Sequence, residues 1–343
     1  MLSERRRRVL KALVEEYIAS GQPVGSKLLV DCYHLGCSPA TVRSELAALE
    51  ETGYVYQPHV SSGRVPTDTG YRAFVDELLE TGKPAPDGEA LPVRRSYLEL
   101  AGEIDDLIRQ TSVALSHLTH YVAVVMAPTL NLSRIRRVDL VSMGARRALL
   151  VVITESGQVV NRHVALSEEA TPERLAEVER ALNASLSDKQ AVEVRPLRRA
   201  MDTGRAEHAL LAEIIGQVLE CLEEADRDRL YHVGVPELLA LPEFSDTSMV
   251  RPLLTVLEDG LVMLETLSEV MRDGGLTVRI GSENSARELG HMSLVATKYG
   301  SENADGIVGV IGPTRMDYSR SIAAVHSAAE ELSEALGGSS ENH

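Results

Sequence analysis

One short stretch, from Ser38 to Pro66, constrains the fold of this chain most strongly. Ser38 can cap a helix by accepting hydrogen bonds from free backbone N–H groups, and Pro39 suits the first helical position because its missing N–H costs nothing there. Apolar residues then recur at helical spacing and form a narrow seam: Val42, Leu46 and Leu49. The stretch therefore predicts a short helix with one buried side.

The other side of this helix carries small side chains and a single arginine. Its members are Ala40, Thr41, Arg43, Ser44, Ala47 and Ala48. Small side chains let a helix approach another surface closely, and the major groove of DNA admits a helix. We expect Thr41, Arg43 and Ser44 to face base edges; a surface arginine without a role is the alternative. Ser38 is chiefly a cap, but the helix start that it shares with Ala40 can also face a phosphate.

A hairpin is predicted directly after this helix. Gly53 ends the helix, residues 54–56 alternate as a strand does, and residues 58–66 form a tight tip. The apex of the tip is expected to contain Ser61, Ser62, Gly63 and Arg64. A helix followed by a basic hairpin is typical of a winged helix-turn-helix that binds DNA.

Four residues of the hairpin are candidate DNA contacts. Arg64 at the apex would contact a phosphate or the minor groove. Ser61 and Ser62 would donate hydrogen bonds to phosphates, or they only form the turn. His59 is the weakest of the four, because a histidine beside a proline is more often structural.

Two further helices are predicted before the central stretch. Residues 3–20, stopped by Gly21, form the first. A short second helix begins at residues 24–26, with these side chains directed inward: Leu28, Leu29 and Cys32. The basic run at residues 5–8 either grips phosphates beside the groove or is a solvated face. With another helix from residue 67, residues 1–80 predict a complete DNA-binding domain.

The net charge of −16 argues at first sight against a nucleic-acid partner, but it is unevenly distributed. Residues 1–75 contain nine Lys and Arg against eight Asp and Glu, a balance of +1, which leaves −17 for the rest. An acidic body that repels phosphates everywhere except at one end would keep nonspecific DNA affinity low. The alternative is that the charge serves solubility alone.

Other functional classes find little support in the sequence. Cys32, His34 and Cys37 lie close together but lack a fourth metal ligand, so we expect no metal and no other cofactor. The chain has no G-x-S-x-G, H-E-x-x-H, Walker or G-x-G-x-x-G motif, so we expect no enzyme and assign no catalytic residue. No apolar run approaches the ~18–20 residues that span a bilayer. We expect a cytoplasmic protein with no membrane partner.

The rest of the chain mixes strands and helices. A linker with Pro and Gly at 81–92 precedes a helical pattern over 93–119 and a buried strand at 121–126. Three strand-like runs follow, at 135–141, 148–154 and 158–164. Their short connections require antiparallel neighbours, and helices at 171–186 and 207–222 would cover one face of that sheet.

The C-terminal part continues the mixed pattern. It predicts strands at 231–235, 276–280, 292–297 and 307–311, one or two helices over 250–270, and a last helix over 318–336. Residues 337–343 are expected to be disordered. Strands and helices without strict alternation predict an α+β multidomain protein.

Five segments resemble one known family. They are P-V-G-S-K at 23–27, S-P-A-T-V-R at 38–43, Q-P-H-V-S-S-G-R-V-P-T-D at 57–68, G-Y-R-A-F-V-D at 70–76 and G-V-I-G-P-T-R-M-D-Y-S-R at 309–320. In these segments the chain resembles the heat-inducible transcription repressor HrcA family. Because they lie near both ends, the resemblance covers nearly the whole chain.

The resemblance implies an N-terminal winged helix, a GAF-like domain at 93–130 and 228–336, and an inserted α/β dimerisation domain at 131–227 with a three-stranded antiparallel sheet. It implies a homodimer that binds an inverted-repeat operator in double-stranded DNA, represses chaperone operons and is released on heat stress. It also implies that the GroEL chaperonin maintains its activity. The alternative is a small-molecule-responsive winged-helix regulator with a ligand in the GAF-like domain.

Two details of the resembling segments leave questions open. Ser44 stands where the family usually has Asn, and serine is a more permissive base contact, so the operator preference is not specified. Arg315 and Asp317 are expected either to form a domain-locking pair or to contact a ligand.

Overall fold

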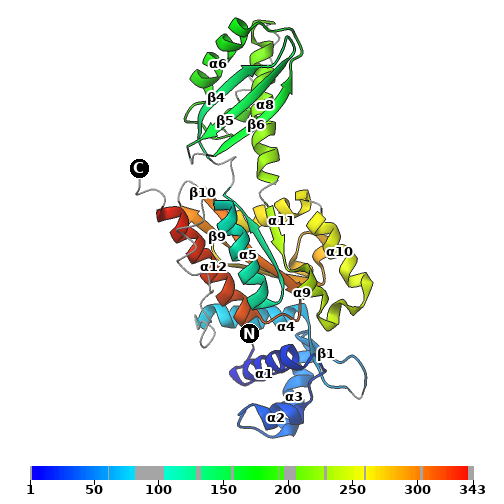
Figure 1. The fold of residues 1–343 in the computed structure, drawn as a ribbon. Coiled ribbons are helices and arrows are strands. Elements are labelled where there is room, and N and C mark those ends of the chain that lie inside the picture. The colour runs from blue at the N-terminus through cyan, green and yellow to red at the C-terminus, as the bar shows by residue number, and fades with distance from the viewer. Residues whose placement is uncertain are drawn as a thin grey trace. The chain divides into compact units, whose positions relative to one another are not determined.

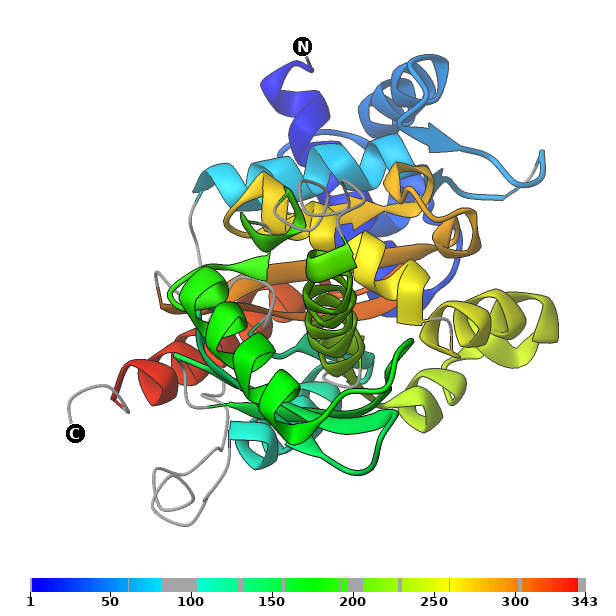
Figure 2. The same cartoon turned by 90° about the horizontal axis from the view of Figure 1, so that it is seen from above.

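The structure is a computed structural model, and it describes residues 2–60, 62–81, 104–128, 133–155, 158–191, 193–196, 206–227, 230–258, 260–301 and 304–338. The chain forms two compact units (Figures 1 and 2). The first contains Met1–Val125, His232–Lys298 and Ile307–Leu332, and the second contains Met126–Tyr231, Tyr299–Gly306 and Ser333–His343.

The first unit begins with three helices, as predicted. They are α1 (Glu4–Ser20), α2 (Ser26–Cys32) and α3 (Pro39–Glu51). The Ser3 side chain accepts a hydrogen bond from the Arg6 N–H at the start of α1, and Gly21 ends the helix in the left-handed conformation at φ 65°. Capping residues that the sequence displays thus place the boundaries of α1.

The predicted inward face of α2 is wrong at two positions. Leu28 is 41% exposed and Cys32 is exposed, whereas Leu29 is fully buried. A helix of two turns presents only one face to its neighbours, and Leu28 lies about 100° around the axis from Leu29. The hydrophobic character of these residues could not indicate which one turns inward.

A short antiparallel hairpin and a fourth helix follow. Strand β1 (Val55–Tyr56) pairs with β2 (Val65–Pro66), so that Val55 lies opposite Pro66 and Tyr56 opposite Val65. Helix α4 (Asp68–Thr81) comes next and buries Tyr71, Phe74 and Val75. The expected linker at 81–92 begins inside α4 at Thr81, and its other residues lie outside the described part of the chain.

A five-stranded sheet with strand order β7-β3-β10-β9-β8 carries the core of the first unit. Its strands are β3 (Val122–Met126), β7 (Leu230–Val233), β8 (Thr277–Ile280), β9 (Met292–Ser301) and β10 (Ala304–Pro313). Every residue of β3 is buried, which confirms the buried strand predicted from its apolar run. Helices α5 (Ile104–Thr119) and α12 (Tyr318–Gly338) lie on one face of this sheet (Figures 1 and 2).

Short helices connect these strands. They are α9 (Val235–Leu239), η2 (Pro242–Ser245), α10 (Thr247–Glu258), α11 (Gly260–Asp273), η3 (Gly281–Glu283) and η4 (Arg287–Leu289). The pattern over 250–270 therefore resolves into two helices. Because α12 continues to Gly338, the expected disordered tail overlaps it by two residues, and residues 339–343 lie outside the description. The expected helical stretch at 93–103 also lies outside it.

The second unit contains the predicted antiparallel meander. Its strands β4 (Ile135–Ser142), β5 (Arg147–Thr154) and β6 (Val159–Ala165) pair in chain order. Helices α6 (Pro172–Leu186) and α8 (Ala206–Arg227) cover one face (Figure 1). The two layers share one apolar core that includes Val138, Leu150, Val152, Leu182, Ile214 and Val218. Within the described helices of the chain, none is long and apolar enough to cross a membrane.

Candidate nucleic-acid interface

The start of α3 has the cap that its sequence predicts. The Ser38 Oγ accepts a hydrogen bond from the Thr41 N–H at 3.2 Å and lies 3.0 Å from the Thr41 hydroxyl. Pro39 occupies the first helical position. This arrangement satisfies one of the free N–H groups and fixes where the helix begins.

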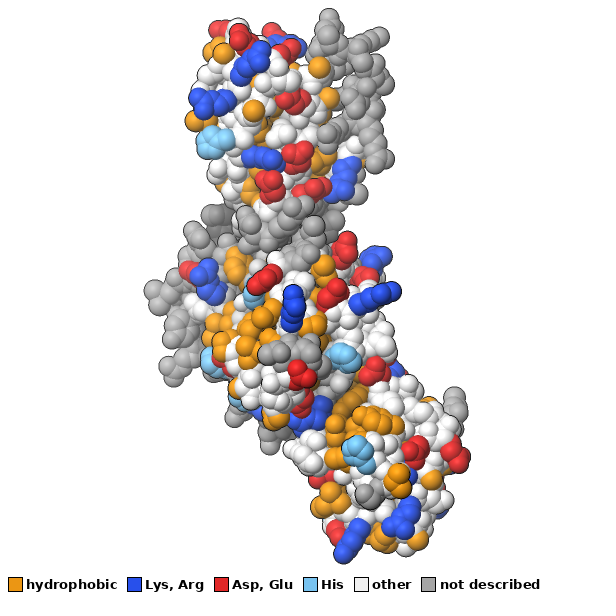
Figure 3. All heavy atoms as spheres, turned by 90° about the vertical axis from the view of Figure 1, so that its right-hand side faces the viewer, with side chains coloured by type: hydrophobic (Ala, Val, Ile, Leu, Met, Phe, Trp, Pro, Cys, Tyr) orange, Lys and Arg blue, Asp and Glu red, His pale blue; other side chains and the backbone are white. Residues whose placement is uncertain are grey.

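The two faces of α3 are also as predicted. Val42, Leu46 and Leu49 are almost completely buried. On the opposite side the exposed residues are Ala40, Arg43, Ser44 and Ala47, and Thr41 is half-buried. Figure 3 shows Lys and Arg side chains among apolar ones at the end of the first unit where α2 and α3 lie. A face with small side chains and one long cation can enter a groove of nucleic acid without steric obstruction.

The tip of the hairpin is a tight turn built by side chains. The Ser62 Oγ accepts a hydrogen bond from the His59 N–H at 3.0 Å and donates one to the His59 carbonyl at 2.7 Å. The Gln57 side-chain amide donates to the carbonyls of Val60 and Ser62 at 2.9 and 2.8 Å. His59 and Val60 are exposed, with Val60 at 99%. Ser62 therefore forms the turn, and Ser61 lies outside the described residues.

Arg64 does not lie at the apex, which corrects the expectation. Its backbone exchanges two hydrogen bonds with Val24, of 2.8 and 2.9 Å. Its guanidinium holds the Glu50 carboxylate, with Nε 3.1 Å and Nη2 2.9 Å from Oε2, and its side chain is only 20% exposed. A Cβ on Gly63 would lie 2.4 Å from the Val24 backbone, so only glycine allows this approach. Arg64 therefore ties the hairpin to α3 and to the segment before α2.

The basic run at residues 5–8 is partly structural. Arg6 pairs with Glu45 at 3.1 Å and joins α1 to α3. Arg8 donates to the His34 carbonyl at 3.1 Å, and Arg7 lies 3.8 Å from Glu4. Arg5 is exposed. Arg6 therefore positions α3, which neither alternative for the run had included. Arg5, Arg7 and Arg8 remain exposed, as both a phosphate contact and a solvated face require.

Tyr33, at the end of α2, has the largest pKa shift next to this surface. Burial raises its pKa to about 12, and the nearby carboxylates of Glu16 and Glu15 act in the same direction. The shift therefore affects the ionisation of this phenol only at alkaline pH. Among the described residues, no group of three His, Cys, Asp or Glu is arranged to hold a metal ion.

The expected pairing of Arg315 with Asp317 is wrong. The Arg315 guanidinium pairs with Glu243 and donates to the Ile18 carbonyl at 2.6 Å. The Asp317 Oδ1 instead accepts from the Arg320 N–H at 3.0 Å, inside the first turn of α12. Adjacent charges in a sequence segment do not reveal partners that lie 72 and 297 residues away. Sequence reasoning likewise missed Asp68 and Arg72 of α4, whose only signal was their place in two resembling segments.

The comparisons with known proteins agree with one another. Residues 105–322 match the family model described as HrcA protein C terminal domain. The heat-inducible transcription repressor HrcA of Frankia casuarinae is 40% identical over 341 residues, which covers 98% of this chain and 99% of that protein. The repressor of the same name from a Nocardioides species is 42% identical over 338 residues, with 98% and 99% covered.

A solved structure supports the fold. It is described as the crystal structure of a hypothetical protein, and it aligns with a TM-score of 0.66 at 24% identity over 98% of this chain and 99% of its own. Both named relatives are described as transcription repressors. Since the family model matches more than half of the chain and these relatives match nearly all of it, the chain belongs to the heat-inducible transcription repressor HrcA family.

Proposed function

We propose that residues 1–80 form a winged helix-turn-helix domain whose α3 enters the major groove of an operator. The observation that carries this proposal is the exposed small-residue face of a capped helix beside a hairpin. Thr41, Arg43 and Ser44 would contact base edges, and the Ser38–Ala40 helix start would face a phosphate. In the hairpin, His59, Ser61 and Ser62 remain candidate contacts to the DNA backbone. Arg64 would instead hold the hairpin against α3, because Glu50 pairs with its guanidinium.

We further propose that the protein acts as a homodimer on an inverted-repeat operator. The support is the face of the β4-β5-β6 sheet that lies opposite α6 and α8 in the second unit. Leu149, Val151 and Ile153 of β5 are only partly buried there, and Val141 and Val159 beside them are 52% and 59% exposed. The apolar row of β5 lies between polar residues of the neighbouring strands, among them Asp139 and Asn161. A partly exposed apolar row with polar neighbours suits a protein interface.

The edge of that sheet is less suited to pairing. Along β4, the Leu140 N–H donates to Glu179 at 2.9 Å, and the Asn183 amide bonds both the N–H and the carbonyl of Val138. Side chains of α6 thus occupy hydrogen-bonding groups that a second strand would need. The face, and not this edge, is the proposed dimer surface, and the segment 131–227 is the proposed dimerisation domain.

In the cell the protein would repress chaperone operons from the cytoplasm and be released on heat stress, with its active conformation maintained by the GroEL chaperonin. The support is membership of the HrcA family. The five-stranded sheet with its helices would be the GAF-like domain, formed from segments on both sides of the inserted one. Release would follow from loss of a marginally stable active conformation when chaperonin is occupied by unfolded proteins.

The effector-responsive alternative has a weaker basis. A surface hollow of about 500 Å³ in the first unit is lined by Glu269, Arg272, Arg279, Glu283 and Ser285. These groups already bind one another: Glu269 pairs with Arg279 and accepts from the Ser285 hydroxyl at 2.7 Å. The Ser285 hydrogen bond and then Arg279 lower the pKa of Glu269, so its carboxylate is charged and satisfied without an effector.

One binding experiment tests the central proposal. The full chain is incubated with a pool of random duplex DNA, bound duplexes are recovered over several rounds at moderate salt, and the enriched sequences are read. Enrichment of an inverted repeat, with bound protein sedimenting as a dimer, is the expected result. Recovery of unenriched random sequence by folded protein would contradict operator recognition. Titration of the enriched duplex with the protein, with and without purified GroEL, tests whether chaperonin changes the fraction of protein that binds DNA.

A further inference from the structure

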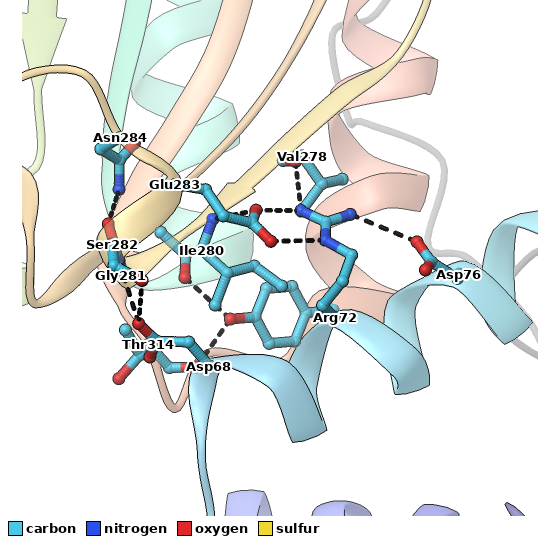
Figure 4. A network of polar contacts seen from close by, with 12 residues as sticks. Asp68, Arg72, Asp76, Val278, Ile280, Gly281, Ser282, Glu283, Asn284 and Thr314 are labelled. Carbon is cyan, nitrogen blue, oxygen red and sulfur yellow. Dashed lines mark hydrogen bonds and ion pairs between the residues drawn. The ribbon is translucent and has the colours of Figure 1, made fainter. Parts of the chain in front are cut away.

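Two side chains of α4 form hydrogen bonds and an ion pair with β8 and the segment that follows it (Figure 4). The Arg72 guanidinium makes a two-pronged contact with the Glu283 carboxylate, with Nε 2.8 Å from Oε1, and donates to the Val278 carbonyl at 2.6 Å. The Asp68 Oδ2 accepts from both the N–H and the hydroxyl of Ser282, each at 2.9 Å. We call Asp68, Arg72, Val278, Ser282 and Glu283 the α4 latch.

The segment that contacts α4 is also fixed by its own hydrogen bonds and by the backbone conformation of Gly281. Gly281 has φ 51°, and a Cβ there would lie 2.3 Å from the Asp68 Oδ2. The Asn284 amide donates to the carbonyls of Gly281, Leu289 and Met292, and Glu283 also accepts from the Ile280 N–H at 2.9 Å. None of these bonds involves an atom of α4, so they restrain the carboxylate and the Ser282 N–H independently of it (Figure 4).

A second contact, which we call the Arg315 brace, holds the C-terminal end of α1. Arg315, in the turn between β10 and α12, donates to the Ile18 carbonyl in the last turn of α1 and pairs with Glu243 of η2. Between the two braces, the rings of Tyr71 and Tyr318 lie 5.8 Å apart. Residues 2–81 are thus attached to the five-stranded sheet and its connecting helices at three points.

These contacts are better suited to fixing an orientation than to supplying binding energy. Arg72 and Glu283 remain 26% and 34% exposed, and solvent screening weakens a pair of that kind. The Tyr71 hydroxyl and the Glu243 Oε2 are buried without a hydrogen-bond partner among the described residues. A two-pronged arginine–carboxylate contact, however, strongly restricts direction. The contacts between residues 2–81 and the five-stranded sheet are therefore directional and only moderately stable.

We propose that the α4 latch and Arg315 are positioning elements that set the half-site spacing accepted by the dimer. This inference rests on the proposed operator binding. A dimer reads two half-sites at one separation only if each recognition helix is held in a fixed direction on its own body. When the braces are removed, residues 2–81 keep their covalent connection and the Tyr71–Tyr318 contact, but fewer directional contacts fix α3. The effective concentration of the second helix at the correct half-site then falls.

The test compares DNA spacings rather than a single affinity. The inverted repeat selected by the full-length wild-type protein is prepared with its original spacer, with the spacer lengthened by about half a helical turn (about 5 base pairs), and as a single half-site. Binding of each duplex is measured for wild type, Arg72→Gln, Arg315→Gln and the charge-exchanged pair Arg72→Glu with Glu283→Arg. Arg174→Gln, which removes a surface pair with Glu177 in the second unit, is the control.

We expect wild type and Arg174→Gln to prefer the original spacer strongly. Arg72→Gln and Arg315→Gln should reduce the affinity ratio between original and lengthened spacers by about tenfold, with half-site affinity unchanged. The charge-exchanged pair should recover part of the ratio. A uniform loss on all three duplexes, or a wild-type ratio in both Gln variants, would overturn the positioning role. If wild type itself selects no inverted repeat, the proposed function fails, which is a separate result.

Discussion

The guanidinium of Arg315 donates a 2.6 Å hydrogen bond to the main-chain carbonyl of Ile18, 297 residues away in the sequence. The contact places a positive charge at the C-terminal end of α1, where helix carbonyls are unsatisfied and the helix dipole is negative. The contact joins a segment near the C-terminal end of the chain to the N-terminal helices.

Arg43→Ala should weaken binding to the selected operator by about 1–3 kcal/mol and relax sequence discrimination. The side chain is exposed on α3, so its removal should leave the fold unchanged. Fluorescence anisotropy with the operator and with single-base variants measures both effects. Arg174→Ala removes the same charge from the second unit and serves as control. Unchanged affinity and specificity would remove Arg43 from the interface.

Ser38→Ala should destabilise the N-terminal helices by about 1 kcal/mol, because the N–H of Thr41 loses its acceptor. Ser38→Asp should retain the cap yet bind DNA more weakly, since its charge would face a phosphate. Hydrogen exchange of α3 amides reports the first effect, and operator titration at two salt concentrations reports the second. If Ser38→Asp binds DNA as well as wild type does, this end of α3 does not face the backbone.

Arg315→Ala should lower the local stability of α1 by about 1–3 kcal/mol. The substitution removes the hydrogen-bond donor to the Ile18 carbonyl. It also leaves Glu243, whose side chain is only 22% exposed, without its ion-pair partner. Native-state hydrogen exchange measures this locally, which matters in a chain with two compact units. Lys11→Ala, at a surface pair with Glu77, should change protection by far less.

Val151→Asp should weaken the dimer by at least about 2 kcal/mol if the open sheet face is the interface. Val151 lies at the centre of that face, opposite Asp139 on one side and Asn161 on the other. Sedimentation of the full chain over a concentration series measures the dissociation constant. Ala184→Asp adds the same charge on the exposed side of α6 and should leave it unchanged. A dimer equally stable in both variants would place the interface elsewhere.

Alkaline pH should destabilise the N-terminal helices through Tyr33. Burial, with a smaller contribution from Glu16 and Glu15, raises its folded-state pKa to about 12 from 10.0. A pKa raised by folding contributes stability that is intact below pH 10 and is lost as pH rises toward 12. The ultraviolet absorbance of tyrosinate, compared between wild type and Tyr33→Phe, isolates this titration. Titration of Tyr33 together with exposed tyrosines would contradict the expectation.

Much of the fold follows from local sequence. The cap at Ser38 and Pro39 and the seam of Val42, Leu46 and Leu49 predict α3 to within one residue at its start, because each signal acts within a turn or two of helix. The short turns at 143–145 and 155–157 require antiparallel pairing in the β4-β5-β6 sheet for the same reason. In both cases the physical cause lies between near neighbours in the chain.

Contacts between distant residues were decided by the tertiary structure alone. The hairpin places Arg64 beside Val24 and Glu50 instead of at its apex, and the sheet brings Glu283 to Arg72 across 211 residues. A local pattern specifies which side of an element is apolar, but not what that element packs against. Capping residues and periodicity therefore determined the elements of this protein, while the packing of those elements chose the partners of its arginines, because long-range ion pairs depend on topology and not on spacing.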